Sequence, residues 1–422
     1  MADADLDLIR VRRQEGKLVF KVAPPEGGEY LLKMYSPPRS KRLAVSRSEA
    51  ALRSQLLWQT ALTHEAGLPT PEPFPTSGGS LTARASVEDA SEERLCVMTR
   101  WVPGELKEPK GLTLEDVRRI GSYAAGLHNH AEAFSPPKDF VRPRWDWKRT
   151  FGPSAQLWRR GRAVYSRGEM ATFKDAAELV RRDLRELGEG NDVFGLIHRD
   201  IQAKNLVFDG DGVAAIDFES CGWGHYLFDL ALITLRLQRR QPKRHAELHS
   251  ELLEGYREER HLPESHETYF ETFVVMRLVE RLGVILHMKD IRDRPYFADA
   301  AKRVGEFVED RREREPGMFL RLRARRILRD LKGMLPFRRP APPRSGGAAK
   351  SGYLFPITLT LTRSSLASSF LAAGFRTSDS LSLSGRTFSS SFSIRRSRRR
   401  ERAVWAATSI RISSSATSRQ PS

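Results

Sequence analysis

The sequence has little cysteine and no long apolar run. Only 2 cysteines occur among its 422 residues, and Cys96 and Cys221 fit no disulfide or metal-ligand spacing, which indicates a reducing compartment. No uninterrupted apolar stretch reaches the roughly 18 residues of a membrane span. The opening MADADLDLIR carries acids where a secretory signal carries lysine and an apolar run. These absences predict a cytoplasmic protein that has no membrane partner.

Positive charge is abundant, but it is not spread evenly along the chain. A formal net charge of +18 would by itself suggest a nucleic-acid or membrane-surface partner. Residues 338–422, however, hold 15 Lys and Arg against 2 Asp and Glu, so this tail carries most of the excess. The chain before the tail is only mildly basic, which disfavours a nucleic-acid partner.

The tail is of low complexity and begins within a proline-rich segment, FRRPAPPR. Residues 345–422 contain 21 serines together with the run RRSRRRERA. This composition predicts a disordered segment. Two other interpretations stay open: an Arg/Ser-rich arm that binds nucleic acid, and a translation artefact such as a shifted reading frame at the end of the gene.

The first hundred residues are predicted to be rich in β-structure. Leu18–Val22 and Tyr30–Tyr35 are short apolar runs separated by the turn-forming APPEGGE segment, which predicts a hairpin. Leu95–Arg100 has the composition of a buried strand. The chain from there to the tail has a mostly helical pattern, apart from a strand-rich stretch at 194–217. This order predicts a small β-rich lobe, a connector and a larger helical lobe.

Two of the predicted helices have recognisable ends. One is predicted from about Ser48 to Ala66, with Gly67 as its C-terminal cap. A second is predicted to begin at Thr113, whose side chain can cap it, while Asp116 three residues later completes a capping box. Both helices therefore have a start or stop signal in the sequence itself.

Polar residues suited to phosphoryl transfer lie at the ends of two predicted strands. Asp200 is followed by Asn205 and then by an apolar strand, and Asp217 ends the next apolar run. Phosphoryl transfer needs one carboxylate that orients the acceptor hydroxyl and takes its proton. It also needs oxygen ligands that hold magnesium against the nucleotide phosphates. Asp200 fits the first role, and Asn205 and Asp217 fit the second.

The same segment resembles the aminoglycoside phosphotransferase family, a broad group of small-molecule kinases related in fold to protein kinases. Four motifs occur in the family's order and spacing: His198-Arg199-Asp200 with Asn205, Ile216-Asp217-Phe218-Glu219, Gly222-Trp223-Gly224 and Asp229-Leu230-Ala231. The resemblance covers about residues 9–330. It implies an α+β, two-lobed protein-kinase-like fold, with a nucleotide-binding lobe at 1–100, a catalytic and acceptor-binding lobe at 101–337, and the tail at 338–422.

The resemblance also implies an activity. The expected enzyme uses ATP and Mg²⁺ to move the γ-phosphate to a hydroxyl of a small molecule, of the aminoglycoside-like, amino-alcohol, sugar or homoserine class, with Asp200 as catalytic base. Two alternatives stay open. Arg199 stands where the family usually has glycine, and the resulting HRD motif favours a protein Ser/Thr kinase of the bacterial stress-kinase type. Gln55 and an indistinct glycine loop favour a non-catalytic, ATP-binding pseudokinase.

The lysine that holds the nucleotide phosphates is expected at Lys33, on a strand of the small lobe. Its acidic partner on the next helix falls on Gln55, which can hydrogen-bond a lysine but cannot neutralise it. Glu49, six residues upstream in the same helix, is the other candidate. The resemblance therefore predicts either a weakened ion pair or a substitution by Glu49.

The remaining nucleotide contacts are expected from backbone groups. Gly16 lies between the first two predicted strands, where either a phosphate-covering loop or a plain hairpin turn belongs. The adenine ring is expected against the backbone of Met98 and Arg100, where a strand leaves the small lobe. Because backbone groups would bind the base, the identity of these side chains says little.

Several nearby residues have a structural and a functional interpretation. Asp229 and His198 are expected to support the catalytic loop rather than to take part in the chemistry. Glu219 is either a solvated carboxylate or an additional ligand on the metal side. The cluster Trp145–Lys148 either binds a cationic or amphipathic acceptor or packs in the protein interior.

Overall fold

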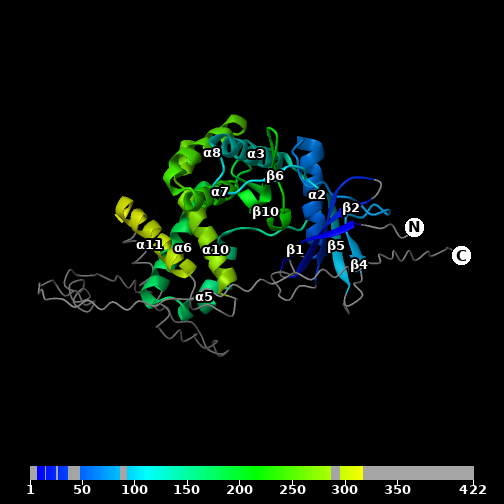
Figure 1. Ribbon diagram of the computed structural model, residues 1–422. Helices are drawn as coiled ribbons and strands as arrows, with labels where there is room; N and C mark the ends of the chain where they lie inside the picture. Colours follow the sequence, from blue (N-terminus) through cyan, green and yellow to red (C-terminus); the bar gives the residue numbers. More distant parts are fainter. Residues whose placement is uncertain are drawn as a thin grey trace, which may run out of the picture. The chain divides into compact units, whose positions relative to one another are not determined.

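The computed structural model describes residues 7–14, 16–24, 27–36, 48–85, 93–286 and 295–316. Figure 1 shows two regions in this part of the chain: a β-sheet with helix α2 beside it, and a larger group of helices. The tail predicted at 338–422 lies outside the described residues. Its three interpretations therefore all concern residues that the structure does not describe. Within the described ranges, no helix has both the length and the apolar composition that a membrane crossing needs.

The first region contains a five-stranded antiparallel sheet in the order β1-β2-β3-β5-β4. Its strands are β1 (Asp7–Gln14), β2 (Lys17–Ala23), β3 (Tyr30–Tyr35), β4 (Ala83–Ala85) and β5 (Arg94–Arg100). β2 and β3 pair as the predicted hairpin, and β5 is the strand predicted at 95–100. The β-rich character predicted for this region is therefore confirmed.

The register of the sheet presents three polar side chains on one face. Lys17 of β2 lies opposite Tyr35 of β3, and residues directly opposite each other in antiparallel strands point to the same side. Lys33 is two residues from Tyr35 on the same strand, so it shares that side. Lys17, Lys33 and Tyr35 can therefore contact a common partner.

Helix α2 (Glu49–Ala66) has both of its predicted ends. Ser48 Oγ accepts a hydrogen bond from a backbone N–H of the first turn at 3.2 Å. Gly67 has a left-handed φ of 64°, which glycine adopts without strain. Leu52 and Leu56 form an apolar cluster with residues of β3 and β5, which holds the helix against the sheet.

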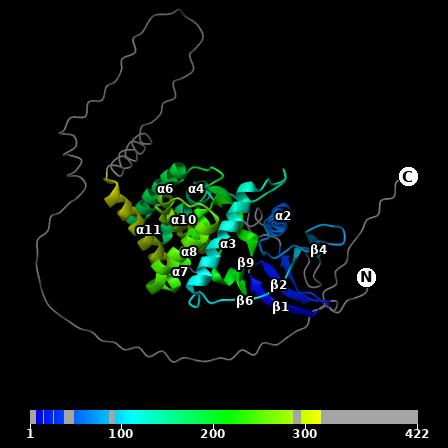
Figure 2. The same ribbon diagram turned by 90° about the horizontal axis from the view of Figure 1, so that it is seen from above.

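The larger region is built mainly from helices. They are α3 (Leu114–Ala133), α4 (Trp147–Phe151), α5 (Gln156–Arg160), α6 (Arg167–Leu187), α7 (Leu227–Arg240), α8 (His245–Glu259), α9 (Glu264–Glu267), α10 (Phe270–Ile285) and α11 (Pro295–Arg314). The capping box predicted at α3 is present, because Thr113 Oγ1 accepts from Asp116 N at 3.1 Å and Thr113 N donates to Asp116 Oδ2 at 2.9 Å. Figure 2 shows α3 between the sheet and helices α7 and α8.

Two small sheets in the larger region hold the loops of the predicted site. They are β7 (Phe194–Ile197) with β10 (Gly222–His225), and β6 (Glu105–Leu106) with β8 (Leu206–Asp209) and β9 (Gly212–Ala215). Asp200 lies in the loop after β7, and Asp217 lies in the loop after β9. Ile216 N donates to Asn205 O at 2.8 Å, which brings the second loop against the residues before β8.

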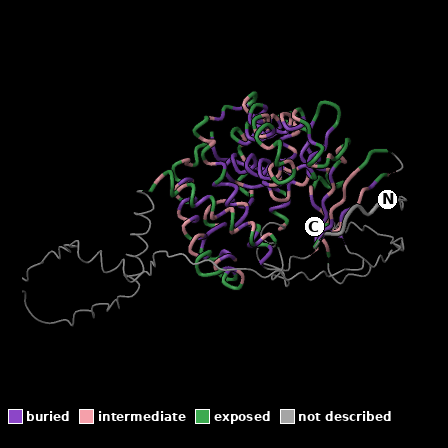
Figure 3. Tube along the Cα trace, turned by 60° about the vertical axis from the view of Figure 1, so that its left-hand side comes forward, coloured by how far each residue is buried: buried purple, intermediate pink, exposed green. Residues whose placement is uncertain are grey.

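The buried core lies mainly in the helical region, as the colouring in Figure 3 shows. Apolar side chains of α3, α6, α7, α8 and α10 form one continuous cluster that also includes residues of β7, β8 and β9. The loops after β7 and β9 therefore begin from packed strands, which restricts the positions of the site residues.

Candidate active site

The loop after β7 is held by a buried carboxylate. Asp229, in the first turn of α7, accepts hydrogen bonds from His198 N at 2.8 Å and from Arg199 N at 2.6 Å. The His198 ring joins this loop to the next, since Nε2 lies 3.2 Å from Ile216 O and Nδ1 lies 3.2 Å from Asp200 N. Burial lowers the pKa of His198, so its ring is neutral near pH 7. His198 and Asp229 thus support the loop, in agreement with their predicted roles.

Asp200 and Asn205 are in direct contact. Asn205 Nδ2 donates to Asp200 O and to Asp200 Oδ2, each at 2.9 Å. Gln202 Nε2 donates to Asp200 Oδ1 at 2.8 Å, and Arg277 Nη2 of α10 lies 3.2 Å from the same oxygen. Because the amide nitrogen of Asn205 faces Asp200, its amide oxygen is the group left for a cation. The Asp200 side chain is 18% exposed, which leaves it accessible to an acceptor.

Two carboxylates and two lysines meet where the sheet contacts the loop after β9. Lys33 Nζ lies 3.1 Å from Asp217 Oδ1 and 3.3 Å from Glu219 Oε1. Lys17 pairs with Glu219 and lies 3.7 Å from Asp217 Oδ1. Tyr35 OH donates to Glu219 Oε1 at 3.1 Å. The three side chains that share one face of the sheet therefore all contact Glu219, and the two lysines also contact Asp217.

The charges in this network stabilise one another. Burial opposes the ionisation of Asp217 and Glu219, but Lys33 and Lys17 outweigh burial, and the pKa of each carboxyl is lowered. Burial also opposes the charge of Lys33, but the two carboxylates outweigh it and raise the pKa of that lysine. Asp217 has a left-handed φ of 65°, a conformation that is uncommon for residues other than glycine and that recurs at functional sites. The donor set of ionised carboxylates and lysines suits magnesium and nucleotide phosphates.

Gln55 does not reach Lys33. Its Nε2 donates to Gln59 Oε1 at 2.9 Å, within α2. Glu49, the other candidate, pairs with Arg84 at 2.9 Å. The acidic partners of Lys33 therefore come from the loop after β9 and not from the helix that follows β3.

The other residues expected at the nucleotide have different surroundings. Gly16 has a φ of 78° in the turn between the paired strands β1 and β2. This position fits both a hairpin turn and a loop over the phosphates, so the part of Gly16 at the nucleotide stays a prediction. The backbone of residues 72–74 accepts from Arg100 N at 2.7 Å and donates to Met98 O at 2.8 Å. Since these two groups are bonded within the protein, an adenine ring would have to use other backbone groups of the 98–101 segment.

The two indole rings of the Trp145–Lys148 cluster pack against the protein, with Trp145 buried and Trp147 partly buried. Trp145 Nε1 donates to Ser220 O at 3.0 Å, and Trp147 Nε1 donates to Ala177 O at 2.7 Å. Asp146 caps the N-terminus of α4. The packing interpretation of this cluster therefore applies, and its two indole N–H groups are not free to bind an acceptor.

Arg142, which the sequence did not predict, ties α2 to the loop after β9. Its guanidinium donates to Ala51 O at 2.9 Å, to Glu219 O at 2.8 Å and, through Nε, to Cys221 O at 2.8 Å. Arg142 lies in an irregular segment before α4, so no periodic pattern marked it. Arg142 thus connects α2 to the loop after β9, although α2 provides no acidic partner for Lys33.

Lys17 and Arg277 also lie in the site without having been predicted. Lys17 stands at the polar start of β2 and resembles an ordinary exposed strand lysine in sequence. Arg277 interrupts the apolar run Phe273–Val279 of α10. An arginine within an apolar helix is unusual, and this was the available sign of a role for Arg277.

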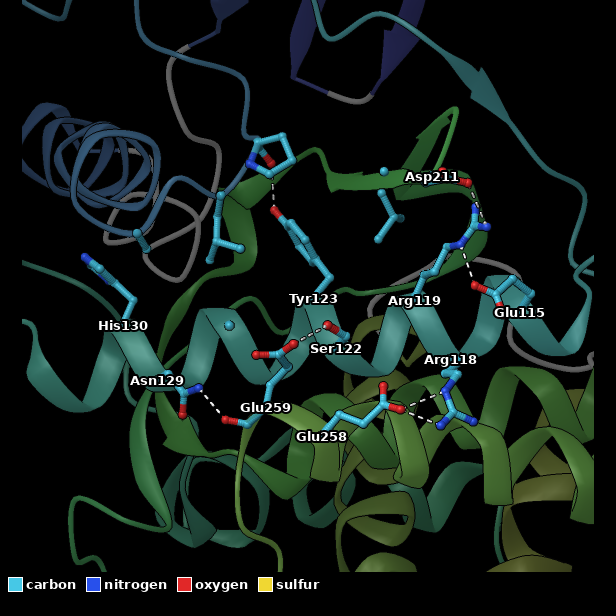
Figure 4. Close-up of a pocket in the computed structure, with 16 residues that line it drawn as sticks. Glu115, Arg118, Arg119, Ser122, Tyr123, Asn129, His130, Asp211, Glu258 and Glu259 are labelled. Carbon is cyan, nitrogen blue, oxygen red and sulfur yellow. Dashed lines mark hydrogen bonds and ion pairs between the residues drawn. The ribbon is translucent and has the colours of Figure 1, made fainter.

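A cavity of about 700 Å³ lies along α3 and contains none of the site residues described above (Figure 4). Its arginines are paired with carboxylates: Arg118 with Glu258, and Arg119 with Glu115 and Asp211. Both arginines of this cavity are therefore paired, and its four carboxylates, Glu115, Asp211, Glu258 and Glu259, leave the lining net negative. It is separate from the candidate active site.

A β-rich region that contributes Lys33 and a helical region that contributes Asp200, Asn205 and Asp217 define a two-lobed, protein-kinase-like molecule. The comparison with known families agrees with this class. The model of the phosphotransferase enzyme family APH matches residues 8–265. The chain belongs to this family, as its motifs predicted.

The chain is similar to several characterised kinases. The structure of a microcompartment-associated aminopropanol kinase is 25% identical with a TM-score of 0.58, over 74% of this chain and 94% of that chain. The structure of an amicoumacin kinase in complex with AMP-PNP, Ca²⁺ and Ami is 17% identical with a TM-score of 0.58, over 72% of this chain and 88% of that chain. The amicoumacin kinase of Bacillus subtilis (strain 168) is 23% identical over 193 residues, which are 45% of this chain and 53% of that relative. The chain thus matches about half the length of this curated relative, and the structural likeness confirms the predicted fold class.

Proposed function

We propose that this protein is a phosphotransferase that moves the γ-phosphate of ATP to a hydroxyl of a small molecule and requires Mg²⁺. A continuous series of contacts from Asp200 to Lys33 carries the proposal. Asn205 donates to Asp200 at 2.9 Å and accepts from Ile216 N at 2.8 Å, and the next residue, Asp217, accepts from Lys33 at 3.1 Å. A base, two oxygen ligands and a cation are thus adjacent, in the order that phosphoryl transfer needs.

Each of these groups has a distinct part in the proposed reaction. Asp200 orients the acceptor hydroxyl and takes its proton as the acceptor oxygen bonds to the γ-phosphorus and the bond to ADP breaks. The Asn205 amide oxygen and the Asp217 carboxylate would hold magnesium, which supplies positive charge to the nucleotide phosphates. Lys33 binds the phosphates from the sheet side. Glu219 lies between Lys17 and Lys33 and keeps both lysines at this position.

The similarity to an aminopropanol kinase supports a small hydroxyl compound as the acceptor. The surroundings of Arg199 and Gln55 do not support the two alternatives, a protein kinase and a pseudokinase. Arg199, the reason for a protein kinase, is 3% exposed and pairs with Glu280 in the interior. Gln55, one of the two reasons for a pseudokinase, lies apart from Lys33, whose charge is balanced by other carboxylates. A small-molecule phosphotransferase is therefore the function that this site supports best.

Substitutions at the two carboxylates test the proposal. Asp200→Asn is expected to keep ATP binding and to lose turnover by about 10²–10⁴-fold, because an amide cannot take the hydroxyl proton. Asp217→Asn is expected to lose magnesium-dependent ATP binding. Asp211→Asn removes an exposed carboxylate of the β8–β9 turn and is the matched control, with both properties retained.

The measurement uses the full chain, with ADP release for turnover and calorimetry with AMP-PNP for binding, with and without magnesium. The acceptor panel holds amino-alcohols, sugars, hydroxy acids, aminoglycosides and a basic protein. Equal turnover by the wild type and Asp200→Asn would remove the base role. Magnesium-independent ATP binding would remove the metal site, and turnover of the basic protein alone would favour a protein kinase.

A further inference from the structure

Four arginines lie on the facing helices α7 and α10, and one of them, Arg277, contacts Asp200. Arg277 Nη2 of α10 lies 3.2 Å from Asp200 Oδ1, and Arg281 follows one helical turn later. Arg236 and Arg239 lie on one side of α7, which packs against α10. These four residues, Arg236, Arg239, Arg277 and Arg281, are called the arginine cluster below.

Tyr296 of α11 joins the two helices within the arginine cluster. The guanidinium of Arg239 lies 5.5 Å from the centre of the Tyr296 ring, and that of Arg281 lies 5.1 Å from it. Tyr296 OH donates to Leu278 O of α10 at 3.3 Å, which fixes the ring at this place. The cluster is therefore one site built from three helices and not a set of separate surface residues.

The carboxylates near the arginine cluster do not balance its charge. Arg277 pairs with Asp200, and Arg239 pairs with Asp299. Neither Arg236 nor Arg281 makes a hydrogen bond or ion pair with any residue in the described part of the chain. Among the described residues, these two positive charges thus have no acidic partner.

This arrangement leaves buried nitrogen atoms without hydrogen bonds and places like charges close together. The Nε atoms of Arg236 and Arg277 are buried and have no hydrogen-bond partner among the described residues, although buried N–H groups are nearly always bonded. Burial, together with repulsion from Arg277 and Arg281, lowers the pKa of Arg236 to about 10. Like charges held together in this way are stabilised when an anion binds among them.

The two arginines of the cavity along α3 have different surroundings. In the cavity of Figure 4, Arg118 and Arg119 are each paired with carboxylates at the protein surface. Arg236 is partly buried next to the reacting groups and has no such partner. Its planar guanidinium, like that of Arg281, suits two-pronged hydrogen bonding to a carboxylate or a phosphate.

We propose that the acceptor is a small hydroxyl compound that carries an anionic group, a carboxylate or a phosphate, which Arg236 and Arg281 bind beside Asp200. This proposal rests on the proposed function and specifies its acceptor. The anionic group pairs with the two arginines, and the hydroxyl of the same molecule points to Asp200, which takes its proton. Among the acceptor classes expected from the family, only homoserine carries a carboxylate, which could pair with the two arginines although the molecule also carries an ammonium group. Amino-alcohols and aminoglycosides, which are cations at neutral pH, would be repelled by the arginine cluster.

A set of three-carbon acceptors that differ mainly in charge tests the proposal on the full chain with ATP and magnesium. The probes are 3-aminopropan-1-ol, propane-1,3-diol, 3-hydroxypropanoate and glycerol 3-phosphate. The expected result is a kcat/KM for the carboxylate or the phosphate that exceeds the other two by at least about tenfold, the effect of one or two hydrogen bonds to a charged group. The carboxylate and phosphate arms distinguish the two sources of negative charge.

Variants of the cluster separate binding from chemistry. Arg236→Gln and Arg281→Gln are each expected to raise KM for the preferred anion about tenfold with little change in kcat. Lysine at either position is expected to recover part of the loss. Arg118→Gln, in the cavity of Figure 4, is the matched control and should change neither value. A role in folding alone would not produce this split between KM and kcat.

Calorimetry with the enzyme bound to magnesium and AMP-PNP provides a readout that does not require turnover. Binding of 3-hydroxypropanoate or glycerol 3-phosphate at millimolar concentration, weakened in Arg236→Gln, would support the proposal. Preference for the amine or the diol, equal values for all four compounds, or no anion binding would overturn it. Failure of the proposed function is a separate result, because it appears as loss of magnesium-dependent ATP binding or as equal turnover by wild type and Asp200→Asn.

Discussion

Arg199 has a left-handed backbone, with a φ of 71°. This conformation costs a residue other than glycine about 1–2 kcal/mol, and the family pattern usually has glycine at this position. The guanidinium lies 4.2 Å from the Trp145 ring and 4.5 Å from the Phe228 ring. It also pairs with Glu280, which is 4% exposed. The contacts of the side chain therefore offset the strain of the backbone.

Replacing Arg199 separates these two effects. Arg199→Gly is expected to lower the free energy of unfolding by about 2–3 kcal/mol, because relief of strain is smaller than the cost of leaving Glu280 buried without its cation. Combining it with Glu280→Gln should recover most of the loss. Urea unfolding of the wild type, the two single variants and the double variant measures the coupling. A glycine variant as stable as the wild type would show that the ion pair contributes nothing net.

At the scale of secondary-structure elements, α2 is connected to the site through Arg142. In place of an acidic residue of α2 that binds Lys33, the guanidinium of Arg142 joins Ala51 O of α2 to Glu219 O and Cys221 O. A second link comes from Val141 N, which donates to a serine of α2 at 2.8 Å. The position of α2 is thus coupled to the loop that presents Asp217 and Glu219.

Arg142→Ala is expected to lower both stability and nucleotide affinity. It leaves buried backbone carbonyls without donors, each at about 1–3 kcal/mol, and frees the loop that holds Asp217. Arg53→Ala, on the exposed side of α2 where the arginine pairs with Asp139, is the matched control and should cost less than about 1 kcal/mol. Denaturant unfolding and AMP-PNP calorimetry measure the two effects. A fall in stability with unchanged affinity would assign Arg142 to the fold alone.

Much of the fold could be predicted because its determinants are local. Gly67 and the Thr113–Asp116 capping box act within one turn of a helix, and the β2–β3 hairpin is set by neighbouring apolar runs. Spacing in one motif also predicted that Asp200 and Asn205 would lie together. The contact of Lys17 with Glu219 could not be predicted in this way, because it joins residues 202 positions apart through the register of a sheet and the geometry of a loop.

The arginine cluster was hidden for the same reason. Its members lie on two helices that are separate in the sequence, and their approach to Asp200 depends on how α7 and α10 pack. Composition indicated the tail as the basic part of the chain, since most of the excess positive charge lies at 338–422. At the scale of the whole molecule, the net charge of the chain and the local charge of the arginine cluster are therefore separate properties. The first predicts attraction to a polyanion, and the second predicts a small anionic acceptor.

Deleting residues 338–422 separates them experimentally. The deletion should weaken retention on a polyanion such as heparin, because non-specific attraction follows the excess of positive charge. It should leave the ratio of kcat/KM for 3-hydroxypropanoate over 3-aminopropan-1-ol unchanged. An ion pair in direct contact with Arg236 is screened little by salt, whereas charges separated by more than about 10 Å are largely screened from each other at 0.1 M salt. Measuring both properties for the full chain and for residues 1–337, at low and high salt, checks this. If deletion of the tail abolishes the preference for the anion and Arg236→Gln keeps it, the tail selects the acceptor. If the deletion keeps the preference and Arg236→Gln abolishes it, the helices beside Asp200 select the acceptor.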